Sequence, residues 1–113
     1  MGRMQGKVAL ISGAAAARDG QLMGFGGASA HAFAREGARV VLTDIRDDLG
    51  TASVEAMRAR GYDARYRRLD VTVEADWRDA VAFTLAEFGE LNVLVNNAGA
   101  VARVDIDPGI TIA

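Results

Sequence analysis

The stretch that decides the fold is 91–99, in which the apolar run Leu91-Asn92-Val93-Leu94-Val95 is closed by Asn96-Asn97-Ala98-Gly99. A short apolar run that ends in a turn is typical of a strand buried on both faces of a parallel sheet. Two earlier runs have the same form: Lys7-Val8-Ala9-Leu10-Ile11-Ser12 before Gly13, and Arg39-Val40-Val41-Leu42-Thr43 before Asp44. We therefore expect these three runs to be buried strands.

Helical segments separate the apolar runs. Residues 27–36 suit a helix that presents Ala28, Ala32 and Phe33 on one face and ends at Gly37. The remaining elements are expected as a helix from Asp47 or Asp48 to Gly61, a strand over residues 64–69, and a helix from Thr72 to Gly89. Asp47 or Asp48 and then Thr72 are the predicted caps of the second and third helices.

Strands that alternate with helices through short loops imply parallel strands joined by right-handed crossovers. The sequence thus predicts an α/β fold with a doubly wound parallel sheet in the strand order 3-2-1-4. We expect residues 1–99 to form this domain, truncated after its fourth strand, and residues 100–113 to form a tail without clear structure. An apolar fourth strand without a neighbour would invite association with another chain, so we also expect a homo-oligomer.

Composition narrows the classes of function. The 113 residues fit one domain, and a net charge of −2 gives no basis for binding nucleic acid or an anionic membrane. The chain has no cysteine and only one histidine, His31, so thiol catalysis and a metal cluster are not expected. His31 is expected on the outer side of the first helix. No apolar stretch approaches the roughly 18 residues of a membrane span, and residues 1–6 do not suit a signal peptide, which predicts a cytoplasmic protein.

The turn after the first strand is the first candidate site. Gly13 begins this turn, and Gly24-Phe25-Gly26 lies just before the first helix. Glycines at these positions let the backbone approach a pyrophosphate, which sits on the positive N-terminal end of the helix. Arg18 is the one basic residue of the intervening segment, and we favour simple solvation over a phosphate contact for its side chain.

Asp44 ends the second strand, 18 positions after Gly26. The dinucleotide fingerprint places an acid near this spacing, where it accepts hydrogen bonds from the adenosine ribose hydroxyls. The alternative is an acid that complements the dipole of the next helix. An aspartate here repels the extra phosphate of NADP, since two unit charges about 4 Å apart cost roughly 4 kcal/mol at an effective dielectric of about 20. NAD is therefore expected rather than NADP, a preference that Arg46 would soften.

These motifs resemble the short-chain dehydrogenase/reductase family over residues 6–99. Three further segments carry the likeness: Ala32-Phe33-Ala34-Arg35-Glu36-Gly37-Ala38, Asp70-Val71 and Asn96-Asn97-Ala98-Gly99. The family usually has three residues between its first two glycines, whereas Gly13 and Gly24 enclose ten, and Phe25 replaces the usual isoleucine or leucine. Stretched loops also occur in the family's enoyl-reductase branch, which Ser29-Ala30 resembles and the Asn-Asn-Ala-Gly motif does not.

The resemblance implies a Rossmann-like fold and an NAD(P)-dependent oxidoreductase that transfers a hydride between nicotinamide and a carbonyl/alcohol pair. It also implies that Asp70 meets the adenine amino group, although Asp70 as a helix cap is the alternative. Val71 would line the ring pocket, and Ala98-Gly99 would admit the second ribose. The nominated cofactor-binding residues are Gly13, Gly24, Phe25, Gly26, Asp44, Ile45, Asp70, Val71, Asn97, Ala98 and Gly99.

The family's catalytic tyrosine is followed four residues later by a lysine. Tyr62 and Tyr66 are the only tyrosines, neither has a lysine at that spacing, and the single lysine is Lys7 in the first strand. We therefore nominate no catalytic residue and no metal ligand, and we expect the catalytic half to be absent from this chain. The alternatives are a non-catalytic nucleotide-binding module or inactive remnant, and one part of a split enzyme. The small-molecule substrate is not identifiable from these residues.

Overall fold

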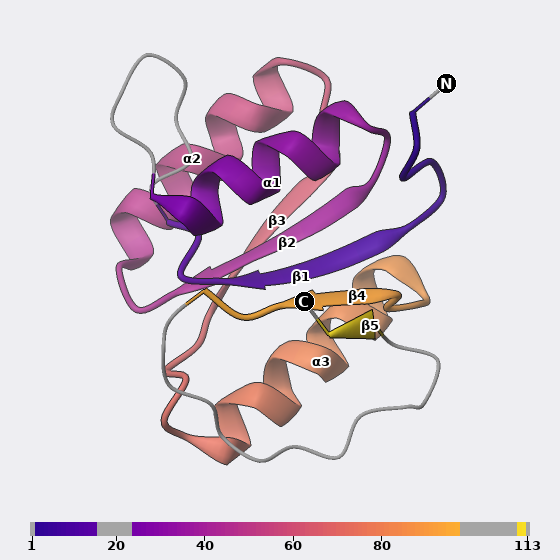
Figure 1. Cartoon of the computed structure of the whole chain (residues 1–113). Coiled ribbons are helices and arrows are strands. Elements are labelled where there is room, and N and C mark those ends of the chain that lie inside the picture. Colours follow the sequence, from indigo (N-terminus) through magenta and orange to yellow (C-terminus); the bar gives the residue numbers. More distant parts are fainter. Residues whose placement is uncertain (1, 16–23, 98–110, 113) are drawn as a thin grey trace.

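A computed structural model of the chain describes residues 2–15, 24–97 and 111–112. Strands and helices alternate along most of the chain (Figure 1). The elements are β1 (Val8–Ser12), α1 (Phe25–Arg35), β2 (Arg39–Asp44), α2 (Asp47–Ala59), β3 (Ala64–Arg68), α3 (Glu74–Phe88), β4 (Val93–Val95) and β5 (Thr111–Ile112). None of the helices in these described ranges is both long and apolar enough to cross a membrane.

The strands form one sheet in the order β3-β2-β1-β4-β5, and every described pairing is parallel. In the centre of the sheet, Leu10 pairs with Val41 on one side and with Leu94 on the other. The doubly wound parallel sheet and the order 3-2-1-4 are thereby confirmed. Figure 1 shows α1 and α2 over one face of the sheet and α3 over the other.

Both faces of the sheet carry a core, which explains why β1 and β2 are apolar at nearly every position. Ala9, Ile11, Val40 and Leu42 pack on the face covered by α1 and α2. The intervening residues of the same strands, Val8, Leu10 and Val41, pack with Trp77, Ala80 and Phe88 of α3. Because successive side chains of a strand point to opposite faces, a strand covered on both sides needs an apolar residue at every position.

The structure corrects the predicted orientation of α1. The residues that α1 buries are Gly26, Gly27, Ala30 and Ala34, together with His31. Ala28 and Ala32, which we expected on the buried face, are exposed. His31 is only 2% exposed, and its ring lies edge-on to Tyr62 with the ring centroids 6.2 Å apart. Small side chains let α1 lie close to the sheet. The prediction relied on larger apolar residues to identify the buried face, and this face consists mainly of glycine and alanine.

The predicted helix ends are right and the predicted caps are wrong. Each helix is followed by a glycine with positive φ, at Gly37, Gly61 and Gly89. The N-cap positions of α2 and α3 are Arg46 and Val73, and neither makes a side-chain capping hydrogen bond. Acidic residues in the first turns, such as Asp47 and Glu74, instead complement the helix dipoles without occupying the cap positions.

The expectation of an unpaired fourth strand is also wrong. β4 pairs with β1 on one side and with β5 on the other, where Val93 is opposite Thr111 and Leu94 is opposite Ile112. A strand of two residues has too little pattern to be recognised in a sequence. The homo-oligomer stays a prediction, now without an unpaired β4 as its reason. The rest of the predicted tail lies outside the described residues.

Candidate functional site

The loops that follow β1, β2 and β3 meet at one edge of the sheet and line an open cavity of about 300 Å³. Parallel strands bring their carboxyl ends to the same edge, which is where ligands bind in open sheets of this kind. The structure brings together five of the nominated residues there and adds Arg46 and Leu69 to them. The cavity is lined by Gly13, Asp44, Ile45, Arg46, Leu69, Asp70 and Val71.

The three glycines of the turn after β1 have different structural roles. Gly13 has φ 64°, a left-handed conformation that favours glycine. A Cβ placed on Gly26 would overlap the carbonyl oxygen of Gly13, so Gly26 allows α1 to begin directly against the end of β1. A Cβ on Gly24 would meet no atom within 4 Å. Phe25 is 89% exposed, and Gly24, Phe25 and Gly26 do not belong to the described lining of the cavity.

Asp44 is the acid of the cavity, and its side chain is almost entirely buried. Its carboxylate accepts hydrogen bonds from the backbone amides of Ala15 at 3.1 Å and Ile45 at 2.7 Å. Arg46 donates through Nε at 3.2 Å and Nη2 at 3.0 Å, and through its backbone amide. Burial raises the pKa of Asp44, but these hydrogen bonds outweigh burial and hold the pKa below the ordinary 3.8. Asp44 is therefore a carboxylate at neutral pH.

The hydrogen-bonding capacity of Asp44 is fully used in this arrangement. A carboxylate offers about four lone-pair sites, and five N–H groups of Ala15, Ile45 and Arg46 surround this one. The side chain of Arg46 is 56% exposed, whereas the other donors are backbone groups. The guanidinium is thus the donor that can move away and leave Asp44 free to accept a hydrogen bond from a ligand.

Asp70 shapes the loop between β3 and α3. Its carboxylate accepts hydrogen bonds from the hydroxyl of Thr72 at 2.6 Å and from the backbone amide of Thr72 at 2.9 Å. These bonds lower the pKa of Asp70. The backbone amide of Asp70 donates to Asp76 at 2.9 Å, and the carbonyl of Val71 accepts from Trp77 at 2.9 Å. Side chains of α3 therefore hold Asp70 and Val71 at the cavity.

Ser12, which was not among the nominated site residues, joins the end of β1 to the end of β4. Its hydroxyl lies 2.9 Å from Oδ1 of Asn96, and it accepts a hydrogen bond from the backbone amide of Asn97 at 3.0 Å. Asn96 is thus linked to Ser12 through its side chain, whereas Asn97 is linked to Ser12 through its backbone amide. The polar last residue of an apolar strand was the available signal for Ser12. Ala98 and Gly99 lie outside the described residues.

A family model and several known proteins are similar to this chain. Residues 20–110 match a family model described as enoyl-(acyl carrier protein) reductase. The 2,5-dichloro-2,5-cyclohexadiene-1,4-diol dehydrogenase LinX of Sphingobium indicum is 44% identical over 97 residues, which covers 86% of this chain and 36% of that protein. The 3-alpha-(or 20-beta)-hydroxysteroid dehydrogenase of Mycobacterium tuberculosis is 48% identical over 98 residues, covering 87% of this chain and 34% of that protein.

A solved structure is also similar to this chain. The short-chain dehydrogenase/reductase from Burkholderia phymatum in complex with NAD superposes with a TM-score of 0.74 at 32% identity. The match covers 84% of this chain and 31% of that one. The chain spans about a third of the length of the curated relatives that it matches.

Proposed function

The chain belongs to the short-chain dehydrogenase/reductase family, and from that premise we propose that it is the NAD-binding part of an oxidoreductase. The proposed reaction is hydride transfer between nicotinamide and a carbonyl/alcohol pair. The observation that carries the proposal is the cavity at the carboxyl ends of β1, β2 and β3, where Asp44 ends β2.

The residues of the cavity fit the adenosine half of a dinucleotide. Ile45, Leu69 and Val71 provide apolar walls of the kind that an adenine ring needs, and Asp44 and Asp70 provide acceptors for hydroxyl and amino groups. The bound cofactor would supply the hydride chemistry at its nicotinamide. The part of the protein described here would bind and orient the adenosine end, with the carboxylate of Asp44 as the acceptor for ribose hydroxyls.

The charge of Asp44 supports NAD over NADP. Its lowered pKa keeps the carboxylate ionised at neutral pH, so a phosphate on the adenosine ribose would face a buried negative charge. The guanidinium of Arg46 lies on that carboxylate and reduces the repulsion without removing it.

We predict that NAD binds about tenfold or more tightly than NADP, a difference of about 1.4 kcal/mol or more in binding free energy. Calorimetric titration of the chain with both cofactors at one salt concentration measures this difference. Equal or inverted affinities would contradict the assignment of Asp44 and with it the choice of NAD.

We also predict that the 113-residue chain alone shows no sustained turnover. General acid–base catalysis contributes about 10²–10⁴-fold, and neither tyrosine is suited to supply it. The hydroxyl of Tyr66 is engaged by Asp44 and Asp47, and burial followed by the hydrogen bond to Asp47 raises its pKa. An assay against a panel of alcohols and ketones with NAD and NADH tests this prediction. Turnover that survives repurification would refute it.

A further inference from the structure

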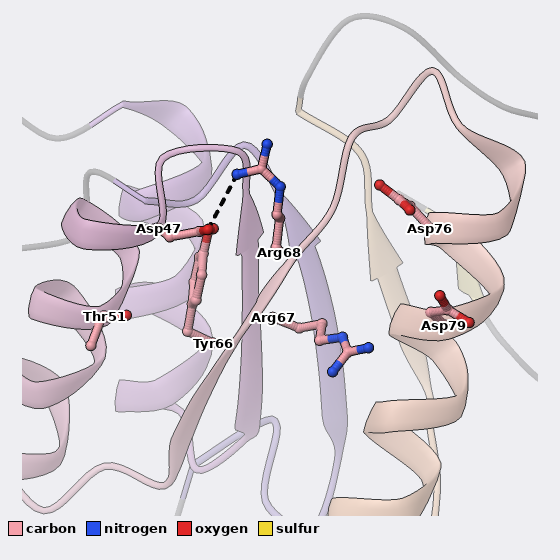
Figure 2. Close-up of a pocket in the computed structure, with 7 residues that line it drawn as sticks. All are labelled: Asp47, Thr51, Tyr66, Arg67, Arg68, Asp76 and Asp79. Atoms are coloured by element: carbon pink, nitrogen blue, oxygen red, sulfur yellow. Dashed lines mark hydrogen bonds and ion pairs between the residues drawn. The ribbon is translucent and has the colours of Figure 1, made fainter.

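A second cavity, of about 500 Å³, lies along the edge strand β3, beside the loop that joins β2 to α2. Figure 2 shows two groups among the residues that line it. Asp47, Tyr66 and Arg68 gather at that loop, whereas Asp76 and Asp79 project from α3 on the far side. The first group contacts the same loop that carries Ile45 and Arg46 into the proposed adenosine site.

Tyr66 reaches the loop through its hydroxyl. The oxygen lies 2.8 Å from the backbone carbonyl of Asp44 and 2.7 Å from Oδ1 of Asp47, so the hydroxyl can donate its one proton to either acceptor. Burial and the hydrogen bond to Asp47 raise the pKa of Tyr66 above its ordinary value, so the hydroxyl keeps its proton at neutral pH. Tyr66 is consequently a hydrogen-bond donor to the loop at neutral pH.

Arg68, two residues further along β3, provides a second tie to the same loop. Its Nη1 donates to the backbone carbonyl of Ile45 at 2.7 Å and lies 3.2 Å from Oδ2 of Asp47. The backbone amide of Leu69 adds a hydrogen bond of 2.9 Å to the carbonyl of Asp44. The carbonyls of Asp44 and Ile45 are thus both held from β3, while the side chains of these two residues line the first cavity.

Gly50 in α2 makes room for the Tyr66 ring. A Cβ on Gly50 would overlap the Cε1 edge of that ring. Glycine is an unfavourable residue in the interior of a helix, and Gly50 lies within Asp47–Ala59. Its absent side chain is what allows the tyrosine to lie against α2 with its hydroxyl at the loop.

We propose that Tyr66 is a positioning residue, which holds the loop 44–47 in the shape that presents the carboxylate of Asp44 to the adenosine ribose. The inference rests on the proposed function, because it concerns the same cofactor site. Tyr66 does not line that site and acts on it only through the loop. Arg68 supports the same arrangement by its own hydrogen bond to the loop, and Gly50 supports it by leaving space for the ring of Tyr66.

The test compares Tyr66→Phe with Tyr62→Phe in the full chain. Tyr66→Phe removes only the hydroxyl and should weaken NAD about three- to tenfold, the loss expected for one hydrogen bond. Tyr62→Phe removes the hydroxyl of a tyrosine remote from this loop, packed edge-on to His31, and should change NAD affinity less than twofold. Hydrogen exchange of the Ile45 and Arg46 amides, which donate to Asp44, should accelerate in Tyr66→Phe and stay unchanged in Tyr62→Phe.

A double-mutant cycle with Asp44→Ala distinguishes positioning from general destabilisation. If Tyr66 acts through Asp44, the effect of Tyr66→Phe on NAD affinity should shrink to less than twofold in the Asp44→Ala background. An undiminished effect there, or equal affinities for Tyr66→Phe and Tyr62→Phe, would overturn the inference and leave the proposed function intact. Failure of the unmutated chain to bind NAD would overturn both. If Tyr66→Phe does not fold, Arg68→Gln can replace it in the test, because it removes the hydrogen bond from Arg68 to the carbonyl of Ile45. The same changes in NAD affinity and hydrogen exchange are then expected.

Discussion

Gly26→Ala is expected to lower the free energy of unfolding by about 1–3 kcal/mol, the usual cost of forcing an extra methyl group into a packed site. The new Cβ would overlap the carbonyl oxygen of Gly13 and would lie 2.7 Å from its carbonyl carbon and 2.9 Å from the oxygen of Ser12. All of these are backbone atoms, so no side chain can rotate to make room. α1 would have to shift away from the end of β1 and carry the proposed pyrophosphate site with it.

Urea denaturation and an NAD titration of the same variant measure both effects. Gly24→Ala is the matched control, since a Cβ there meets no atom within 4 Å and the residue has φ −75°, which alanine adopts without strain. We expect that control to lose about 0.5–1 kcal/mol, because alanine is a poorer N-cap residue than glycine, and to keep its affinity for NAD. Similar losses of stability in the two variants would show that the close approach of Gly26 to Gly13 is unimportant.

Asp44→Ala is expected to weaken NAD binding about ten- to a hundredfold, because a hydrogen bond to a charged group contributes about 1.5–3 kcal/mol. The affinity for NADP should fall much less, since the variant also removes the repulsion of the extra phosphate. The difference between the affinities for NAD and NADP should therefore become smaller. Paired calorimetric titrations of the variant and the unmutated chain measure it.

Arg46→Ala is the informative comparison for Asp44→Ala. It removes the exposed guanidinium that occupies both carboxylate oxygens, so Asp44 becomes available to the ribose without competition. In Arg46→Ala the affinity for NAD should stay the same or rise, while the affinity for NADP should fall. The difference between the two affinities should therefore increase, whereas in Asp44→Ala it should decrease. If Asp44→Ala weakens the two cofactors equally, the carboxylate serves the loop and not the ribose.

The sheet was predictable because each of its central strands is a continuous apolar run in the sequence. The residues of β1 and β2 are apolar at nearly every position since both faces are covered, and that requirement appears directly in the sequence. The position of Asp44 followed from its spacing after the glycine turn. Both the apolar strands and the position of Asp44 can therefore be recognised from residues that are close together in the sequence.

The features that escaped prediction depend on contacts between distant residues. Tyr66 and Asp47 are 19 positions apart, and nothing in the sequence around either one signals that their side chains meet. The burial of His31 follows from how closely α1 approaches the sheet, which the glycines and alanines of the helix determine. The pairing of β5 with β4 joins Val93 to Thr111, 18 positions further along the chain, and a strand of two residues leaves no pattern in the sequence.

The contact between Gly26 and Gly13 has a consequence for how freely the segment between them can vary. It brings the start of α1 next to the end of β1, so the segment between them has only a short distance to span. Closing a loop of ten residues instead of three costs only about 1 kcal/mol, because closure entropy grows with the logarithm of length. Additional residues between Gly13 and Gly26 should therefore lower stability little, provided that they leave Ala15 in place, whose backbone amide donates to Asp44.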